Sequence, residues 1–420
     1  MANVSSSNGL EKRPKLRFPG FDEPWEHKEL LHYLVENTDR NKQLKFGKEN
    51  VLSVSGEYGI VNQIAFQGRS FAGESVADYH VVETDDIVYT KSPLKANPYG
   101  IIKVNNGVPG IVSTLYAVYH PLKTVVPRFV DFYFSNDLRL NKFLKPLVNI
   151  GAKHDMKVNN TFVLTGMVVF PPLREQQKIV DFLTILDRRI DVQRKKVEAL
   201  KKYKRGLSSS LFDEISKSGC PTVSFTDGFR LLQNNTFSRD DLSYDVGDVR
   251  NIHYGDVLIK YGTVTDIGAL SVPCIKPDRN IEKFSSSSYL RNGDIVFADT
   301  AEDYTVGKAT EIVGVTHQRV LSGLHTIPCR PHDRFAPMFL GHYFNSYHFR
   351  RQIYRMIQGI KVSSISKSEI AKTTILTPPC DVQRKVASVL SEVDHLIEKE
   401  AETAIVLQKI RCGLLQQLFI

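Results

Sequence analysis

The sequence predicts an α+β protein in which two β-rich domains of mixed structure are joined by two long helices that pack as an antiparallel coiled coil. Three observations predict this fold. A long segment occurs twice, both copies carry an apolar heptad pattern, and the region before each copy consists of short apolar and β-branched runs separated by turn residues. In a chain of 420 residues, these features indicate a tandem repeat with pseudo-twofold symmetry.

The repeat is clearest at the sequences PPLREQQKIVDFLTILD (171–187) and PPCDVQRKVASVLSEVD (378–394). Positions 171–212 align with 378–419 at a constant offset of 207, and 13 of these 42 positions are identical. Weaker sequence matches lie upstream, where DIVY at 86–89 corresponds to DIVF at 294–297 and PRFVDFYF at 127–134 corresponds to PMFLGHYF at 337–344. The whole chain is therefore two copies of one unit, each a variable domain followed by a more uniform segment.

Each uniform segment has the pattern of one long helix. Two prolines open it, and about forty residues without another proline follow. The apolar residues alternate four and three positions apart, which is the heptad period of a coiled coil. These seam positions are Ile179, Leu183, Leu186, Ile190, Val197, Leu200, Leu207 and Leu211 in the first copy, and Val386, Leu390, Val393, Ile397, Ala404, Leu407, Leu414 and Leu418 in the second.

Two polar residues interrupt each seam at equivalent places. They are Gln193 and Lys204 in the first copy and Glu400 and Arg411 in the second. Polar residues at seam positions can fix the register of packed helices, so we expect these four to do so. Antiparallel packing is expected because each helix leads out of its own domain. Two independent core helices are the alternative, although a domain of this size rarely needs a core helix so long.

The repeat divides the chain into six segments. We expect a mobile N-terminal tail at 1–19, a variable domain at 20–170, a helix at 171–213, a linker at 214–221, a second variable domain at 222–377 and a second helix at 378–420. Strand-like runs in the variable domains are Ile87–Thr90, Gly110–Val118, Phe162–Phe170, Val257–Ile259 and Asp294–Phe297, and short helices are expected at Phe129–Asn136 and Met338–Asn345.

The amino-acid composition limits the cellular location and the binding partners that can be expected. The net charge of +9 and the pI near 9.1 admit nucleic acid as a partner. The five cysteines form no C-x-x-C pair, and no apolar run approaches the roughly 18 residues of a membrane span. We therefore expect a reduced, cytoplasmic protein with no metal site and no membrane contact. Residues 171–212 hold 11 Lys+Arg against 5 Asp+Glu. Five lysines near the middle of this segment, Lys195, Lys196, Lys201, Lys202 and Lys204, either contact DNA across the gap or form a face for partner subunits.

Several loops of the variable domains combine basic, amide, hydroxyl and aromatic residues. Lysine neutralises a phosphate, and amide or hydroxyl side chains read base edges, so these loops are the candidates for contact with double-stranded DNA. Taken singly each is more often a solvated turn, and their placement in two duplicated domains favours the DNA reading. The candidates are Lys91, Ser92, Lys95, Asn97, Tyr99, Lys153, His154 and Lys157 in the first domain, and Lys260, Tyr261, Thr300, Tyr304, Lys308, Lys361 and Ser363 in the second.

No catalytic motif is complete. Asn97-Pro98-Tyr99-Gly100 lacks the second proline of the amino-methyltransferase motif. Gly307-Lys308 resembles the end of a phosphate-binding loop, but Glu302 and Ala309 stand where glycine and serine or threonine belong. His154 beside Asp155 is more often a loop contact than a catalytic pair. We predict that the chain is not itself an enzyme and binds no cofactor.

The sequence resembles the specificity subunits of Type I restriction-modification systems over nearly its whole length. KLRFPGFDEPWEHKEL (15–30) resembles the start of that family's first target recognition domain, and PPLREQQKIV (171–180) resembles its central helix. IHYGDVLIKYG (252–262) and IVFADTAEDYTVGK (295–308) look like one version of its second target recognition domain. One position departs from the pattern: Val382 precedes Gln383 where the family usually has glutamate, which is expected to weaken one contact of the second helix.

The resemblance implies a role. Such subunits read the two halves of a split, asymmetric DNA site with two target recognition domains, and their helices set the gap and recruit two modification subunits. S-adenosylmethionine is bound by the modification subunits, and ATP and Mg by restriction subunits that translocate and cleave DNA. Two other classes stay open: a coiled-coil scaffold that binds protein partners through its terminal domains, and a self-sufficient DNA methyltransferase, which the missing motifs disfavour.

Overall fold

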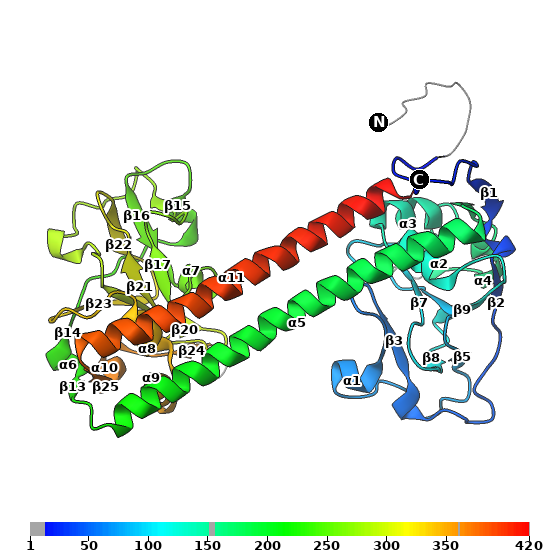
Figure 1. Cartoon of the computed structure of the whole chain (residues 1–420). Coiled ribbons are helices and arrows are strands. Elements are labelled where there is room, and N and C mark those ends of the chain that lie inside the picture. The colour runs from blue at the N-terminus through cyan, green and yellow to red at the C-terminus, as the bar shows by residue number, and fades with distance from the viewer. Residues whose placement is uncertain (1–12, 151–155, 360–361, 420) are drawn as a thin grey trace. The chain divides into compact units, whose positions relative to one another are not determined.

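The computed structural model describes residues 13–150, 156–359 and 362–419. The expected N-terminal tail therefore lies mostly outside the described residues. The chain forms two compact units (Figure 1). Unit 1 contains residues 1–192 and 403–420, and unit 2 contains residues 193–402. The boundaries between the units fall inside both long helices, whereas the six segments expected from the sequence begin and end at helix termini.

Unit 1 is built around an antiparallel four-stranded sheet in the order β2-β9-β6-β7. Helix α2 packs on β7, and the aromatic rings of Phe129 and Phe170 meet in the core beneath it. The sheet strands are β2 (Leu34–Glu36), β6 (Ile87–Thr90), β7 (Ile102–Val104) and β9 (Tyr116–Pro121), and the helices are α2 (Pro127–Phe134) and α3 (Asp137–Leu144). The remaining elements are β1 (Glu26–Glu29), β3 (Leu52–Ser55), β4 (Gly59–Asn62), α1 (Gln63–Gln67), β5 (His80–Val82), β8 (Gly110–Val112), β10 (Asn149–Ile150), β11 (Met156–Lys157), α4 (Asn160–Val163) and β12 (Met167–Phe170).

Unit 2 contains a five-stranded sheet in the order β14-β23-β19-β21-β17, in which only β17 and β21 run parallel. A second sheet has the order β15-β18-β16-β22. The strands are β13 (Thr222–Ser224), β14 (Phe229–Leu231), β15 (Leu242–Ser243), β16 (Val249–Ile252), β17 (Val264–Asp266), β18 (Cys274–Ile275), β19 (Ile295–Ala298), β20 (Thr300–Ala301), β21 (Ala309–Val313), β22 (Arg319–Ser322), β23 (Thr326–Pro331), β24 (Ser363–Ser364) and β25 (Thr374–Leu376). The short helices are α6 (Phe225–Gly228), α7 (Tyr254–Ile259), α8 (Phe339–Asn345), α9 (Tyr347–Ile353) and α10 (Lys367–Ile370).

The two units share one plan, as the sequence repeat predicts. The strand order β2-β9-β6-β7 of unit 1 returns as β14-β23-β19-β21 in unit 2. The antiparallel pair β1 and β12 returns as β13 and β25, and the helices α2 and α3 return as α8 and α9. The units differ outside this shared frame, where unit 1 has the hairpin of β3 and β4 and unit 2 has α7 and a second sheet. The predicted α+β tandem repeat is confirmed.

Two long helices carry the heptad pattern, α5 (Leu173–Lys217) and α11 (Cys380–Gln417). In unit 1, Leu183 near the start of α5 shares a core with Leu418 just beyond the end of α11. In unit 2, Phe212 near the end of α5 shares a core with Leu390 near the start of α11. The helices therefore run antiparallel within each unit, and the described seam residues are all buried or half-buried. None of the described helices is long and apolar enough to cross a membrane.

The four polar seam residues all make contacts between the two helices. Gln193 donates to the Glu400 carboxylate (2.5 Å) and to its backbone oxygen (2.9 Å). Lys204 forms an ion pair with Asp394 (2.5 Å), and Arg411 forms one with Asp187. The last two pairs are equivalent under the offset of 207 residues. Each contact joins one residue of α5 to one of α11, so a slip of either helix would break all three.

Each long helix begins with the same contact to its own domain. The Gln176 side chain accepts a hydrogen bond from the Val126 backbone N–H (2.9 Å), and Gln383 accepts one from Ala336 (2.8 Å). The preceding residues differ. Glu175 is fully buried and takes two hydrogen bonds from Arg17, at 2.7 and 2.8 Å. Val382, at the equivalent position, has no carboxylate. The second helix therefore lacks an ion pair equivalent to Arg17–Glu175, as valine in place of the family's usual glutamate predicts.

Three strand-like runs and one helix end differ from expectation. Val257–Ile259 lies in α7, because His253 caps the helix by accepting from the Gly255 backbone N–H. The run 110–118 is divided by a turn at residues 113–115, and α4 takes up the start of the run 162–170. The first long helix continues past residue 213 to Lys217. Local capping and turn contacts determine where these helices and strands begin and end. Such contacts cannot be predicted from apolar content alone.

Candidate DNA interface

The loop after β6 in unit 1 holds five of the predicted contact residues. Ser92 and Lys95 are exposed, and Tyr99 is half-buried. Asn97 is buried and donates its amide to Asp137 (2.9 Å), so this amide is committed to holding the loop against α3. Gly100 closes the loop with φ +91°, and a Cβ there would lie 1.9 Å from the Thr90 carbonyl oxygen. The loop thus presents Ser92 and Lys95 to solvent from a fixed base.

Lys91 begins this loop and takes part in a polar cluster of unit 1. Its amine donates to Asn160 (3.2 Å), and Asn160 in turn donates to Glu36 (2.8 Å). Burial lowers the pKa of Lys91, and Glu36 opposes that shift. The pKa of buried His80 falls to about 4, first through burial and then through the positive charges of Arg40 and Lys91. Lys91 is therefore partly held inside the protein.

Four predicted contact residues lie in or next to segments that are outside the described residues. Lys153, His154 and Lys361 are outside the described residues. Lys157 is in β11, where it pairs with Asn149 of β10. The structure therefore places the backbone of Lys157 on a two-stranded ribbon, and the expectation for the other three stays a prediction.

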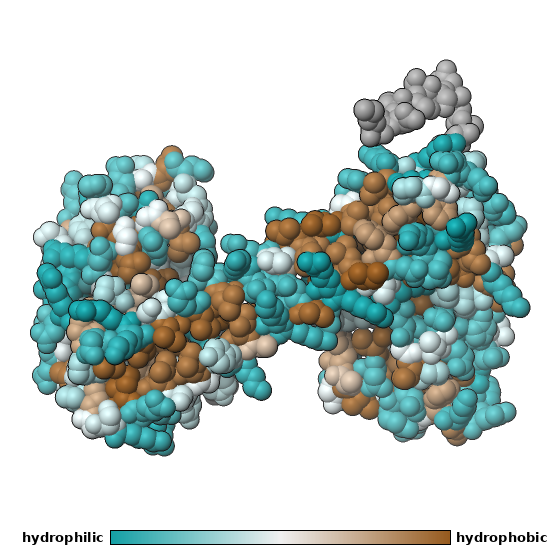
Figure 2. Space-filling model, viewed as in Figure 1, coloured by the Kyte–Doolittle hydropathy of each residue, from teal (hydrophilic) through white to brown (hydrophobic). Residues whose placement is uncertain are grey.

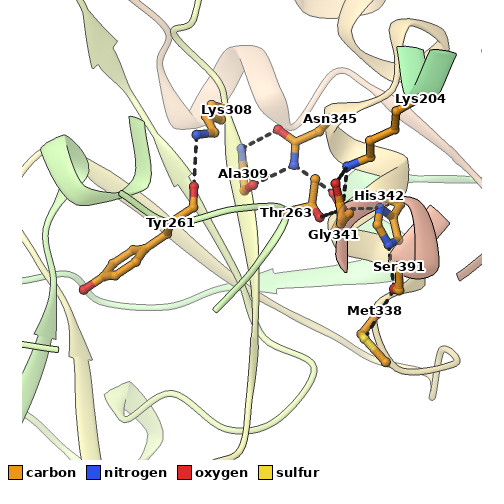
Figure 3. Close-up of polar contacts among 11 residues, drawn as sticks. Lys204, Tyr261, Thr263, Lys308, Ala309, Met338, Gly341, His342, Asn345 and Ser391 are labelled. Atoms are coloured by element: carbon orange, nitrogen blue, oxygen red, sulfur yellow. Dashed lines mark hydrogen bonds and ion pairs between the residues drawn. The ribbon is translucent and has the colours of Figure 1, made fainter. Parts of the chain in front are cut away.

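In unit 2, two predicted contact residues turn inward. The Lys308 amine donates to the backbone oxygens of Leu258 (2.8 Å) and Tyr261 (3.0 Å), as Figure 3 shows for the second contact. Burial lowers the pKa of Lys308, and Arg350 and Lys204 lower it further. Tyr261 is buried, at 2% exposure. The Lys308 amine thus binds carbonyl groups at the end of α7, whereas Lys260, next to Tyr261, is exposed.

The outward-facing candidates of unit 2 lie on neighbouring segments. Lys260 is exposed, and its amine contacts the Tyr244 hydroxyl and the Ser271 carbonyl, both at 3.0 Å. Tyr304 is 81% exposed. Strand β20 pairs with β24, so Thr300 lies opposite Ser364, beside Ser363. Two loops that are distant in sequence are therefore joined at one edge, as a shared binding surface requires.

Sequence reasoning missed a basic cavity of unit 2 between α5 and the helices α8 and α9. Its volume is about 370 Å³, and none of its described lining residues is acidic. Arg350 donates to the backbone oxygens of Tyr304 (2.7 Å) and Val306 (3.0 Å), which joins the cavity to the exposed Tyr304 loop. The lining residues are Lys204, Arg205, Ser208, Thr263, His342, Asn345, Ser346, Tyr347, Arg350 and Tyr354. The segment YHFRRQIYRM (347–356) was the available signal, since arginine and tyrosine together are typical of nucleic-acid surfaces.

Three of the five lysines in the basic stretch of α5 form ion pairs within the protein. Lys196 forms an ion pair with Glu400 (2.6 Å) and Lys204 one with Asp394 (2.5 Å). Lys201 pairs with Glu198 of the same helix (2.9 Å). Neutralised lysines attract a polyanion less, so this stretch is a weaker candidate for DNA contact than its charge suggests. Among the described residues, no three His, Cys, Asp or Glu side chains are grouped to hold a metal.

The fold and these loops define a class of protein: a tandem pair of β-rich units with different surface loops, carried on two antiparallel helices. Residues 74–202 match the model of the Type I restriction modification DNA specificity domain. The fold is similar to that of the S subunit of a Type-I restriction-modification system from M. genitalium, with a TM-score of 0.53, 11% identity, and coverage of 97% of this chain and 99% of that one. A chain from a structure of type I R-M complex assembly and conformational transition matches with a TM-score of 0.56, 16% identity and the same coverage.

These findings confirm the resemblance drawn from the sequence. Residues 74–202 match the specificity-domain model, and the fold is similar to that of an S subunit over nearly the whole chain. The matched residues cover most of the first variable domain, expected at 20–170, and the first part of α5. Unit 2 repeats the frame of unit 1.

Proposed function

We propose that the chain is the DNA specificity subunit of a Type I restriction-modification enzyme, and that each unit reads one half of a split, asymmetric DNA site. The structural repeat carries this proposal. Both units have the same frame of strands and helices, whereas the loops that project from the frame differ in sequence and shape. One frame with two sets of loops suits a site with two unlike halves, because base readout depends on the side chains of the loops.

The chemistry of modification is assigned to other subunits. The modification subunits bind S-adenosylmethionine and methylate an adenine that leaves the base stack, and restriction subunits supply ATP-driven translocation and cleavage. The helices α5 and α11 run through both units, so their proposed roles are to set the gap between the half-sites and to recruit two modification subunits.

Selection from a library tests the proposal. The chain, assembled with its cognate modification subunit, is mixed with duplexes of random sequence, and the bound duplexes are sequenced. We expect two short, unlike motifs separated by a constant number of unspecified base pairs. Enrichment of no motif would contradict DNA reading and favour the scaffold alternative, whereas one continuous motif would contradict the assignment of one half-site to each unit.

The exposed loop lysines should act as phosphate contacts. Replacing Lys95 or Lys260 by alanine removes one cation from each candidate surface, so the slope of log K against log salt should flatten by roughly one unit for each replacement. Lys123→Ala, an exposed lysine outside these loops, is the control and should leave the slope unchanged. The slope is measured from DNA affinities at salt concentrations between about 50 and 200 mM. An unchanged slope for both loop variants would remove these loops from the interface.

The docking sites proposed for the modification subunits are two equivalent apolar strips. Gly206 of α5 and Gly413 of α11 occupy matching positions, and a Cβ added at either would meet no described atom within 4 Å. Tyr203 and Ile410, also matching, are 58% and 47% exposed. Figure 2 shows apolar side chains gathered over the C-terminal half of α11. Glycine inside a helix costs about 1 kcal/mol relative to alanine, and nothing within the described chain requires it here. Close approach of a partner, once on each helix, explains both glycines.

This docking proposal predicts an opposite effect on stability and on assembly. Gly206→Leu should raise the stability of the chain by roughly 1 kcal/mol, because leucine favours the helix and has open space. The same variant should block one strip, so native mass measurements should find one modification subunit bound where the wild type binds two. Adding Gly413→Leu should remove the second. Lys385→Glu, an exposed change elsewhere on α11, is the control. Two bound subunits in the double variant would contradict these strips.

A further inference from the structure

Asp394 of α11 joins three parts of unit 2. Its carboxylate accepts hydrogen bonds from the Lys204 amine of α5 (2.5 Å) and from the Thr263 hydroxyl (3.2 Å). Thr263 belongs to the segment between α7 and β17. His342 of α8 lies 3.9 Å from the same carboxylate. The other ring nitrogen of His342 contacts the Ser391 hydroxyl of α11 (3.0 Å). The Asp394 side chain of α11 therefore contacts both α5 and the β-rich part of unit 2.

The Thr263 contact leads directly to a candidate DNA loop. Lys260 and Tyr261 lie three and two residues before Thr263, with Gly262 between, and Lys260 is the exposed lysine of the unit 2 surface. The Tyr261 carbonyl accepts the Lys308 amine (3.0 Å), which holds the start of the segment. The Thr263 hydroxyl holds its end against Asp394. The segment is thus fixed at one end by the domain and at the other end by the helix pair.

The backbone around Thr263 is packed without room for adjustment. Gly341 of α8 approaches it so closely that a Cβ on Gly341 would lie 2.2 Å from the Thr263 carbonyl oxygen. The same carbonyl accepts the backbone N–H of Glu311 (2.9 Å). The Glu311 carboxylate accepts the N–H groups of Met338 (2.7 Å) and Gly341 (2.9 Å) at the start of α8. The Thr263 backbone is therefore held by α8 and β21, and its side chain by Asp394 of α11.

Unit 1 provides a natural comparison. Asp187, equivalent to Asp394 under the repeat, pairs with Arg411 and lies 3.7 Å from Arg128 at the start of α2. Phe132 occupies the place of His342. The helix-to-helix ion pair is therefore present in both units, but in unit 1 these partners of the aspartate belong to helices and not to a candidate DNA loop.

Resting on the proposed function, we propose that Asp394 is a positioning residue for recognition of the second half-site, acting through Thr263 on the Lys260–Tyr261 loop. The helix pair then does more than separate the units, because it also fixes the loop of unit 2 that reads DNA. Hydrogen bonds to a charged group are among the stronger polar contacts, so their loss is expected to be measurable in discrimination between correct and mismatched sites.

The test uses three variants of the full chain assembled with modification subunits. Thr263→Val removes the hydroxyl and keeps the Lys204–Asp394 ion pair, Asp394→Asn weakens both, and Asp187→Asn weakens the matching ion pair of unit 1. Methylation rates are measured on a duplex with the wild-type site and on duplexes with one mismatch in either half. A loss of general stability lowers all rates together, so the ratio of matched to mismatched rates reports positioning.

Thr263→Val and Asp394→Asn are expected to lower discrimination at the second half-site by about tenfold and to leave discrimination at the first half-site within about twofold. Asp187→Asn is expected to leave both ratios unchanged. If Thr263→Val keeps the wild-type ratio at the second half-site, or if Asp187→Asn lowers that ratio equally, the positioning role is overturned while the proposed function stands. A wild-type assembly that discriminates at neither half overturns the proposed function itself.

Discussion

Four residues inserted between Glu198 and Ala199 should widen the gap between the recognised half-sites by about one or two base pairs. The insertion lengthens α5 by about 6 Å and rotates the C-terminal part of this helix by roughly 40° beyond a full turn. It falls between the Gln193–Glu400 and Lys204–Asp394 contacts, so α11 cannot keep both. Because DNA rises 3.4 Å per base pair, the added length corresponds to about one or two pairs. The half-site sequences should stay the same, since the loops are untouched.

Motifs selected from random duplexes measure this change. The matched control inserts the same four residues after Gly219, in the turn that comes after α5, where the helix and its seam remain intact. That control should keep the wild-type gap. An insertion at Glu198 that changed the half-site bases at the original gap would contradict the separation of base readout from spacing.

The second large effect concerns a buried ion pair of unit 2. Replacing Asp294 by alanine should cost about 3–5 kcal/mol of unfolding free energy, because Arg330 would be left with a buried, unpaired charge. Asp294 is 1% exposed and takes two hydrogen bonds from Arg330, at 2.7 and 2.5 Å, and one from the Arg291 backbone (2.7 Å). The arginine side chain is 12% exposed, so little water would reach its positive charge once Asp294 is removed. Denaturant unfolding at pH 7 measures the loss.

The repeat supplies the matched control for this prediction. Asp86 and His120 are the equivalent pair in unit 1. Asp86 is as buried as Asp294, and burial raises its pKa, although the Glu83 backbone N–H, His120 and the Asn37 side chain oppose that shift. The His120 side chain is 39% exposed, so water can solvate it after Asp86→Ala, and this variant should cost less than Asp294→Ala. An equal or larger cost for Asp86→Ala would contradict the argument that the trapped arginine charge dominates.

The parts of the fold that can be predicted from the sequence are those with a period or a repeat. The heptad spacing predicted α5 and α11, and the paired polar exceptions marked the residues that contact across them, such as Gln193 with Glu400. The repeat of the long helices at a constant offset, together with the weaker matches upstream, predicted that the frames of the two halves match. These signals are strong because many positions must agree at once, and the physical requirement behind them is a continuous buried seam.

The candidate surface could be located only in part. The sequence proposed contact loops in unit 2, but it could not show that Lys308 turns inward to backbone carbonyls while Lys260 faces solvent. The direction of a side chain depends on packing from distant elements. Asn97 is committed to Asp137, forty residues further along the chain, and the basic cavity joins α5 to α8 and α9. Contacts of this kind leave no local pattern of spacing or composition.

The central claim is that the two units read two unlike half-sites. The most direct measurement is a genome-wide map of adenine methylation in cells that express the chain with its cognate modification subunit, compared with cells that express the modification subunit alone. The account predicts one new methylated motif, made of two unlike halves at a constant gap, with a methylated adenine in each half. Methylation that is identical with and without the chain, or a new motif without a gap, would contradict it.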